Sequence, residues 1–244
     1  MSPDNHILEV RGITKAYGRE KVLEDVSLDV REGETLAVLG QSGCGKTTLL
    51  KILAGLIGLQ NGSVKLSGRD ITHNPPNERG MIYIYQEALL FPHLNVFDNI
   101  AFGLRLAKYD EAEVKKLTTD KIDALGLTDH ADKMPDQLSG GQRQRVGFGR
   151  ALIIKPKLLL LDEPFGALDT ATRARMQDLY KSVAAKEGIA SIFVTHDLKE
   201  ALLMGDRFAH MAGGGFKTFA SRSDFIDAPE TGVGAERDFW QGLE

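Results

Sequence analysis

The sequence predicts an α/β fold built around a parallel sheet. Three apolar runs, at residues 35–39, 157–161 and 191–195, have the length and the continuous apolar character of strands that are buried on both faces. A segment with helical spacing follows each run, at residues 47–54, 170–186 and 197–203. Strands that alternate with helices in this way form a parallel sheet with helices on both faces.

Half-buried strands are predicted around the first of these runs. Alternation of apolar and polar residues, or a short apolar run between turn signals, predicts strands at residues 7–10, 22–30, 63–66 and 81–85. Tyr83 and Tyr85 lie in the last of these segments, and we expect both rings simply to pack in the strand. The first ninety residues are therefore rich in strands and turns.

The middle of the chain has a different pattern. Helical periodicity at residues 96–106, 111–125 and 142–154 predicts a mainly helical insert over about residues 90–150. Residues 208–211 and 216–220 flank Gly213-Gly214-Gly215 and are predicted to form a hairpin near the end of the chain.

Size and composition restrict the classes of protein. The 244 residues suffice for one large domain or two small ones, and the net charge of −4 disfavours a dedicated nucleic-acid binder. Cys44 is the single cysteine, which excludes a disulfide within the chain and a multi-cysteine metal cluster. The sequence contains no run of about 18 apolar residues, so no membrane span is predicted. Glycine is in excess, at 26 of the 244 residues.

Some of these glycines form a phosphate-binding motif. Residues 40–47, Gly-Gln-Ser-Gly-Cys-Gly-Lys-Thr, match the pattern G-x-x-x-x-G-K-[ST] between a buried strand and a helix. Glycines let successive N–H groups point at one phosphate, and the helix N-terminus adds positive partial charge. Lys46 is placed to reach the β- and γ-phosphates, and the Thr47 hydroxyl is placed to bind Mg²⁺. A plain strand–turn–helix is the alternative, but the match and its context favour nucleotide binding.

Polar side chains follow the other two buried runs. Asp162 and Glu163 come directly after residues 157–161, and His196 follows residues 191–195. Because the carboxyl ends of parallel strands line the ligand crevice, we expect Asp162 near Mg²⁺, Glu163 as a general base for water, and His196 near the γ-phosphate. Exposed loop acids and a structural histidine are the alternatives.

A second glycine loop precedes the helix at residues 142–154. Leu138-Ser139-Gly140-Gly141-Gln142 is a further candidate anion site, or an ordinary helix start with Ser139 as its N-cap. The chain thus has two phosphate-type loops and one acidic pair. This imbalance is explained if the second loop serves the nucleotide of another subunit.

Taken together, these motifs resemble the ATP-binding subunits of ATP-binding-cassette (ABC) transporters over about residues 7–210. The LSGGQ segment, followed by LLLLDEP and then VTHD, is specific to that family. The resemblance implies a P-loop NTPase (RecA-like) core with an N-terminal antiparallel β-subdomain and an inserted helical subdomain. The expected limits are about 1–89 and 151–220 for the core and β-subdomain, 90–150 for the helical subdomain, and 221–244 for a short tail without a C-terminal regulatory domain.

The resemblance also implies a role for individual residues. Tyr17 matches the aromatic residue that stacks on adenine, and Gln86 matches the glutamine that links Mg²⁺ to the membrane partner. Glu163, His196 and Gln86 are the expected catalytic residues, Thr47, Gln86 and Asp162 the expected Mg²⁺ ligands, and Asp169 the D-loop aspartate. The ATP-binding set is Tyr17, Gly40, Gln41, Ser42, Gly43, Cys44, Gly45, Lys46, Thr47 and Thr48. The signature loop that acts in trans is Leu138, Ser139, Gly140, Gly141 and Gln142.

The family further implies partners and a location. Two cassettes, as a homodimer or with a paralogue, are expected to sandwich ATP and Mg²⁺ head to tail. They would be held by permease subunits at the cytoplasmic face of the inner (plasma) membrane, with an extracytoplasmic substrate-binding protein. Residues 90–96, 137–145 and 162–169 resemble bacterial importers, and similar subgroups handle inorganic anions, iron(III), polyamines or sulfonates. An exporter or lipid-handling ATPase and a non-transport cassette are the alternatives, whereas LSGGQ and the lack of NKxD disfavour a P-loop kinase or GTPase.

Overall fold

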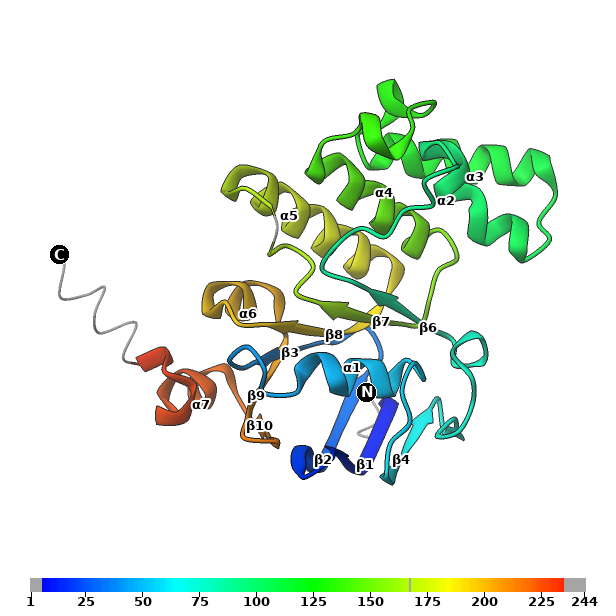
Figure 1. The fold of residues 1–244 in the computed structure, drawn as a ribbon. Coiled ribbons are helices and arrows are strands. Elements are labelled where there is room, and N and C mark those ends of the chain that lie inside the picture. Colours follow the sequence, from blue (N-terminus) through cyan, green and yellow to red (C-terminus); the bar gives the residue numbers. More distant parts are fainter. Residues whose placement is uncertain (1–5, 167, 235–244) are drawn as a thin grey trace, which may run out of the picture. The chain divides into compact units, whose positions relative to one another are not determined.

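The computed structural model describes residues 6–166 and 168–234, which form two compact units. The first unit takes its residues from Met1–Tyr83, Lys157–Glu163 and Gly188–Glu244, and it contains the strands (Figure 1). The second unit takes its residues from Ile84–Pro156 and Pro164–Glu187. The predicted α/β class is confirmed.

A six-stranded sheet forms the centre of the first unit, in the order β10-β9-β3-β8-β7-β6. β3 pairs in parallel with β8 and β9, β8 pairs in parallel with β7, and β10 closes one edge as an antiparallel partner of β9. All residues of β3, β7 and β8 are buried, as the continuous apolar runs predict. The strands are β3 Thr35–Leu39, β6 Met81–Ile84, β7 Leu158–Asp162, β8 Ala190–Thr195, β9 Arg207–Ala212 and β10 Gly215–Phe219.

Alternate residues of β3 face two different hydrophobic clusters. Leu36 and Val38 belong to the cluster that includes helix α1 (Lys46–Leu53) and the strands of a smaller sheet. Ala37 and Leu39 belong to a second cluster with α6 (Leu198–Met204) and α7 (Arg222–Asp227). Because side chains alternate across a strand, the sheet is covered on both faces.

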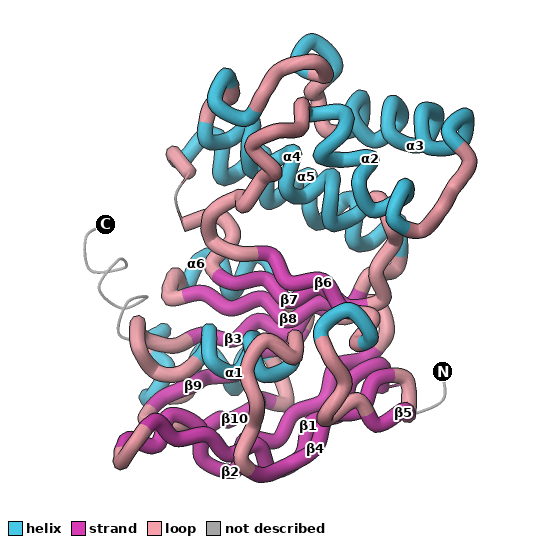
Figure 2. The backbone as a smooth tube through the Cα atoms, turned by 45° about the vertical axis from the view of Figure 1, so that its right-hand side comes forward, coloured by secondary structure: helices cyan, strands magenta, loops and turns pink. Residues whose placement is uncertain are grey.

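The smaller sheet is antiparallel and has four strands in the order β2-β1-β4-β5 (Figure 2). β1 (His6–Tyr17) and β2 (Glu20–Arg31) form one long hairpin. β1 extends well beyond the predicted residues 7–10, whereas β2 agrees closely with the predicted residues 22–30. Their pairing shifts register between Val10 and Ile13, where Gly12 has a φ of 62°. This irregularity interrupts the alternation from which the strands were predicted. β4 (Asn61–Leu66) and β5 (Arg69–Asp70) complete the sheet.

The second unit is helical among its described residues, apart from the end of β6. It contains α2 (Val96–Leu106), α3 (Glu111–Ala124), α4 (Gly140–Leu152) and α5 (Thr170–Glu187), with short 3₁₀ turns between them. Its apolar core includes Ile100, Val114, Ile122 and Val146. α5 joins this unit through Tyr180, whose ring centre lies 6.0 Å from that of Phe148. The helical subdomain was expected over about residues 90–150, a range that does not include α5. These subdomain boundaries stay a prediction.

Part of the predicted tail is folded. Phe225 of α7 is fully buried, with its ring 4.9 Å from Phe208 and 5.3 Å from Phe219. The 3₁₀ turn Pro229–Thr231 follows it, whereas residues 235–244 and Ala167 of the D-loop lie outside the described residues. Among the helices that are described, none is long and apolar enough to cross a membrane.

A buried arginine holds the end of α1. Arg79 is 4% exposed, and its guanidinium donates four hydrogen bonds to carbonyl oxygens of Ile52, Leu53, Thr72 and Asn74, at 2.8–2.9 Å. Burial lowers the pKa of Arg79 from its ordinary value. Helix C-termini leave carbonyl groups without partners inside the helix, and Arg79 supplies donors for two of them.

We predict that Arg79→Met lowers the free energy of unfolding by about 3 kcal/mol, because buried carbonyl groups lose their donors. Urea unfolding of the purified protein measures this change. Arg69→Met is the matched control, since Arg69 is exposed, and it should change the value by less than about 0.5 kcal/mol. Equal effects of the two substitutions would contradict this role of Arg79.

Candidate functional site

The loop between β3 and α1 has a shape that requires glycine at both ends. A Cβ atom at Gly40 would lie 2.5 Å from the Met211 carbonyl oxygen, and one at Gly45 would lie 2.7 Å from that of Val22. Gly45 also has a φ of 106°, and it directly precedes α1. The first N–H groups of a helix have no partners within it, so the loop leads into a donor-rich, electropositive helix end.

Lys46 lies against this loop. Its side chain is 5% exposed, and its Nζ donates to the carbonyl oxygens of Gly40 at 2.6 Å and Gln41 at 3.0 Å. The same Nζ lies 3.7 Å from Oε1 of Glu163, which follows β7. A single buried ammonium group is therefore held between the phosphate-type loop and a carboxylate from a different strand.

The Asp162 carboxylate closes the site from the end of β7. Thr47 Oγ1 donates to Asp162 Oδ1 at 3.0 Å, and the Tyr83 hydroxyl donates to Asp162 Oδ2 at 2.5 Å. Hydroxyl and carboxylate oxygens are the ligands that Mg²⁺ prefers, and Mg²⁺ usually takes only a few of its ligands from protein. In the part of the chain that is described, no three His, Cys, Asp or Glu side chains gather as a metal cage. The oxygens of Thr47 and Asp162 would supply only part of the ligands of a Mg²⁺ ion. They therefore fit an ion that is also bound by a nucleotide.

Glu163 and His196 form a pair beside Lys46. Glu163 Oε2 lies 2.8 Å from His196 Nδ1, while Oε1 of the same carboxylate faces Lys46. Glu163 has a φ of 46°, a left-handed conformation that is uncommon for a residue with a side chain. Strained backbone of this kind is frequent at functional sites. The pair is suited to holding a water molecule and accepting its proton.

Tyr83 contributes a contact that the sequence did not reveal. We expected its ring only to pack in the strand, and the ring does pack against the main core. Its hydroxyl also bonds to Asp162, so the expectation of packing alone is wrong. The two residues are 79 positions apart, and no local pattern shows that β6 and β7 are neighbours.

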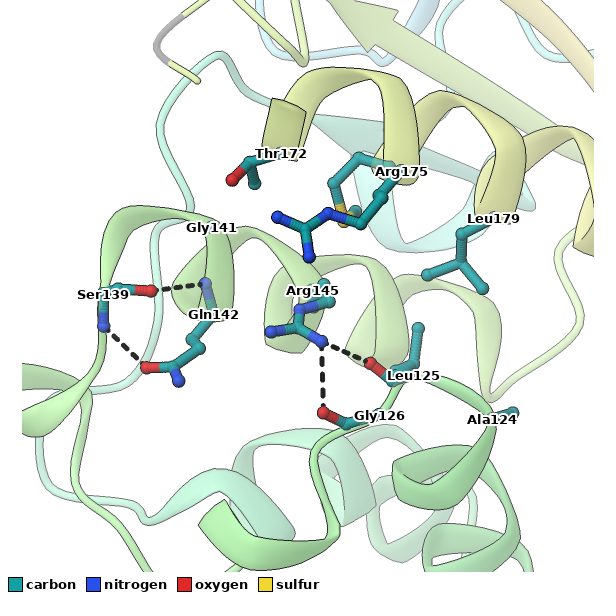
Figure 3. Close-up of a pocket in the computed structure, with 11 residues that line it drawn as sticks. Ala124, Leu125, Gly126, Ser139, Gly141, Gln142, Arg145, Thr172, Arg175 and Leu179 are labelled. Carbon is teal, nitrogen blue, oxygen red and sulfur yellow. Dashed lines mark hydrogen bonds between the residues drawn. The ribbon is translucent and has the colours of Figure 1, made fainter. Parts of the chain in front are cut away.

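The second glycine loop belongs to the second unit and begins α4. Ser139 is the N-cap, as one of the two interpretations predicted: its Oγ accepts from Gln142 N at 3.3 Å, and Gln142 Oε1 accepts from Ser139 N at 2.8 Å (Figure 3). A side chain at Gly141 would require Thr172 to move, because a Cβ there would lie 2.5 Å from Thr172 Cγ2. An N-cap role does not conflict with anion binding, since the loop still ends at a helix N-terminus.

The remaining predicted residues are spread over both units. Tyr17 ends β1 and is 52% exposed, so its ring is accessible for stacking. Cys44 is half-buried in the loop. Asp169 accepts from Thr172 N at 3.0 Å, and hydrogen bonds from the side chain and the backbone of Thr172 lower the pKa of Asp169. Gln86 and Asp169 belong to the second unit, as does the signature loop. Their place relative to the phosphate loop stays a prediction, and so does stacking by Tyr17.

The parallel sheet, its glycine loop and the Thr47–Asp162 pair define the nucleotide-binding class of P-loop proteins. The sequence profile of the ABC transporter family matches residues 23–166, which is more than half of the chain. This chain therefore belongs to the ABC transporter family, as an ATP-binding member.

Curated relatives align with almost all of this chain. It is 44% identical over 224 residues to the spermidine/putrescine import ATP-binding protein PotA of Pasteurella multocida, covering 92% of this chain and 60% of the relative. It is 42% identical over 229 residues to PotA of Bacteroides fragilis, with coverage of 94% and 50%. It is 44% identical over 228 residues to the sulfate/thiosulfate import ATP-binding protein CysA of Acinetobacter baylyi, with coverage of 92% and 65%. The chain thus spans between half and two thirds of the length of these relatives.

We predict that Tyr83→Phe raises the Mg²⁺ concentration needed for tight ATP binding by about tenfold, because groups that orient a metal ligand affect metal affinity on this scale. Calorimetric titration in a Glu163→Gln background measures binding without turnover. Tyr109→Phe, at an exposed tyrosine of the second unit, is the control. An unchanged Mg²⁺ dependence in Tyr83→Phe would show that its hydroxyl does not orient Asp162.

Proposed function

We propose that this chain is the ATP-hydrolysing subunit of an ABC importer. The observation that carries the proposal is the convergence of Lys46, Thr47, Asp162 and Glu163 at one end of the parallel sheet, with contacts of 3.0–3.7 Å between the loop and the acids. The relatives named above support import, since each is named as an import ATP-binding protein.

Each residue of the candidate site has a distinct part in hydrolysis. Lys46 and the N–H groups of the loop hold the phosphates of ATP, and Tyr17 supplies a ring for the adenine. Thr47 and Asp162, with Gln86 as the third ligand implied by the family, would hold Mg²⁺. When bound, that ion neutralises negative charge on the phosphates. Glu163 accepts a proton from the attacking water, and His196 orients that water and the γ-phosphate.

The remaining ATP contact comes from a second cassette. The signature loop has an anion-binding helix start but no acidic residues of its own for hydrolysis. We therefore assign Ser139, Gly140 and Gly141 to the ATP that is bound by the partner subunit, in a head-to-tail dimer of two copies or of this chain with a paralogue. ATP binding closes the dimer, and hydrolysis opens it again.

The dimer would drive a separate permease. The helical unit and the Gln86 segment contact the permease subunits, which place this chain at the cytoplasmic face of the inner membrane. A substrate-binding protein outside the membrane delivers the cargo. Some of the relatives are named for import of a polyamine, and another is named for import of an inorganic anion. We therefore infer that the cargo is a small charged solute. The other subunits of the transporter determine which solute it is.

Glu163→Gln should retain ATP binding and lose at least about 99% of ATP hydrolysis, because the amide cannot accept a proton from water. It should also accumulate as an ATP-bound dimer in size-exclusion chromatography. Glu20→Gln, at an exposed position of β2, controls for loss of charge. Hydrolysis by Glu163→Gln at the wild-type rate would refute its role as the base.

Ser139→Arg should abolish hydrolysis and leave ATP binding to the monomer within about twofold of wild type, because the bulky side chain obstructs a contact made only across the dimer. Fluorescent-nucleotide titration at low protein concentration measures monomer binding, and phosphate release measures turnover. Loss of ATP binding by the monomer would indicate that the loop acts on its own subunit's nucleotide.

A further inference from the structure

A pocket of about 410 Å³ lies within the second unit, and Ser139, Gly141 and Gln142 of the signature loop form part of its lining (Figure 3). The end of α3, the first half of α4 and the first half of α5 form its walls. Leu125, Met176 and Leu179 make one part of the lining apolar. None of the catalytic or metal-binding roles assigned above uses these three side chains.

Two arginines supply the charged part of the lining. Arg145 is held in place by its own bonds, since Nη1 donates to the carbonyl oxygens of Leu125 at 3.0 Å and Gly126 at 3.1 Å. Arg175 makes one weak bond, from Nε to the Ala171 carbonyl oxygen at 3.3 Å. Figure 3 shows the Arg175 guanidinium directed toward that of Arg145.

This pair of cations has no counterion among the described residues. The ion pairs of this part of the chain do not include a carboxylate within 4.0 Å of Arg145 or Arg175. Burial lowers the pKa of Arg145, and the positive charge of Arg175 lowers it further. Two like charges that face one cavity repel each other, and an anion placed between them would relieve that repulsion.

We propose that this pocket binds a small amphipathic anion, with a carboxylate or phosphate head between Arg145 and Arg175 and a short apolar body against Leu125, Met176 and Leu179. Guanidinium groups bind such heads through paired N–H donors. The Thr172 side chain also lines the pocket, and its hydroxyl is hydrogen-bonded to Asp169. The pocket volume is that of a small-molecule site.

The proposed site is separate from the phosphate loop, although it adjoins the signature loop, whose Ser139, Gly141 and Gln142 also line the pocket. All of its lining residues lie within 124–179, whereas the phosphate loop occupies residues 40–47 of the first unit. Arg175 has no part in the proposed hydrolysis, and it is exposed enough to be replaced without disturbing a core. These facts allow the two sites to be tested independently.

The test is a ligand-observed NMR titration of the whole chain at low ionic strength, with phenyl phosphate, phenylacetate and uncharged benzyl alcohol as probes. We expect at least one of the two anions to bind and the alcohol not to bind. Arg175→Gln should weaken anion binding by about tenfold or more, the scale of a lost charge-assisted hydrogen bond, and Arg175→Glu should abolish it. Circular dichroism confirms that each variant is folded.

Two further variants identify the site. Lys46→Ala removes the main phosphate contact of the nucleotide site and should leave anion binding unchanged, and Arg31→Gln controls for loss of a positive charge at an exposed residue of β2. The proposal is overturned if neither anion binds at about 10 mM, if the uncharged alcohol binds as well as the anions do, or if Arg175→Glu binds like wild type. It is also overturned if Lys46→Ala removes the binding, because the probe then occupies the phosphate loop.

Discussion

Parallel pairing of β3, β8 and β7 is the constraint on which the site depends. In this register Leu39 lies beside Thr195, and Asp162 lies beside Val194, so all three strands end at one edge. The residues that follow them are the glycine loop, His196 and Glu163. Functional groups that are more than a hundred residues apart in the chain thereby reach hydrogen-bond distance, as between Thr47 and Asp162. A one-residue slip of β7 would direct Asp162 to the opposite face of the sheet.

Most of this arrangement could be predicted from the sequence, because buried parallel strands have a strong and local signal. The predicted limits of the strand at 35–39 and of the helix at 96–106 agree with the structure. The phosphate loop is equally recognisable, since its residue pattern is contained in eight consecutive positions. The length of β1 was underestimated because register shifts interrupt its alternating pattern.

Contacts that depend on tertiary packing were not predictable. Arg79 follows a polar turn, and nothing around it in the sequence shows that its side chain enters the core to cap α1. The Tyr83–Asp162 bond depends on β6 lying next to β7 in the sheet. The order of strands in a sheet cannot be read from the local sequence pattern. The pairing of Arg145 with Arg175 likewise depends on α5 packing against α4.

In the proposed dimer, each ATP site is completed by the signature loop of a second cassette. Mixing Lys46→Ala subunits with Ser139→Arg subunits tests it most directly, because each variant alone lacks one half of every site. If the loop acts in trans, mixed dimers contain one intact site, and the mixture should recover about a quarter of the wild-type rate of phosphate release, assuming random pairing and independent sites. If the mixture is as inactive as the separate variants, although mixed dimers form, the claim is contradicted.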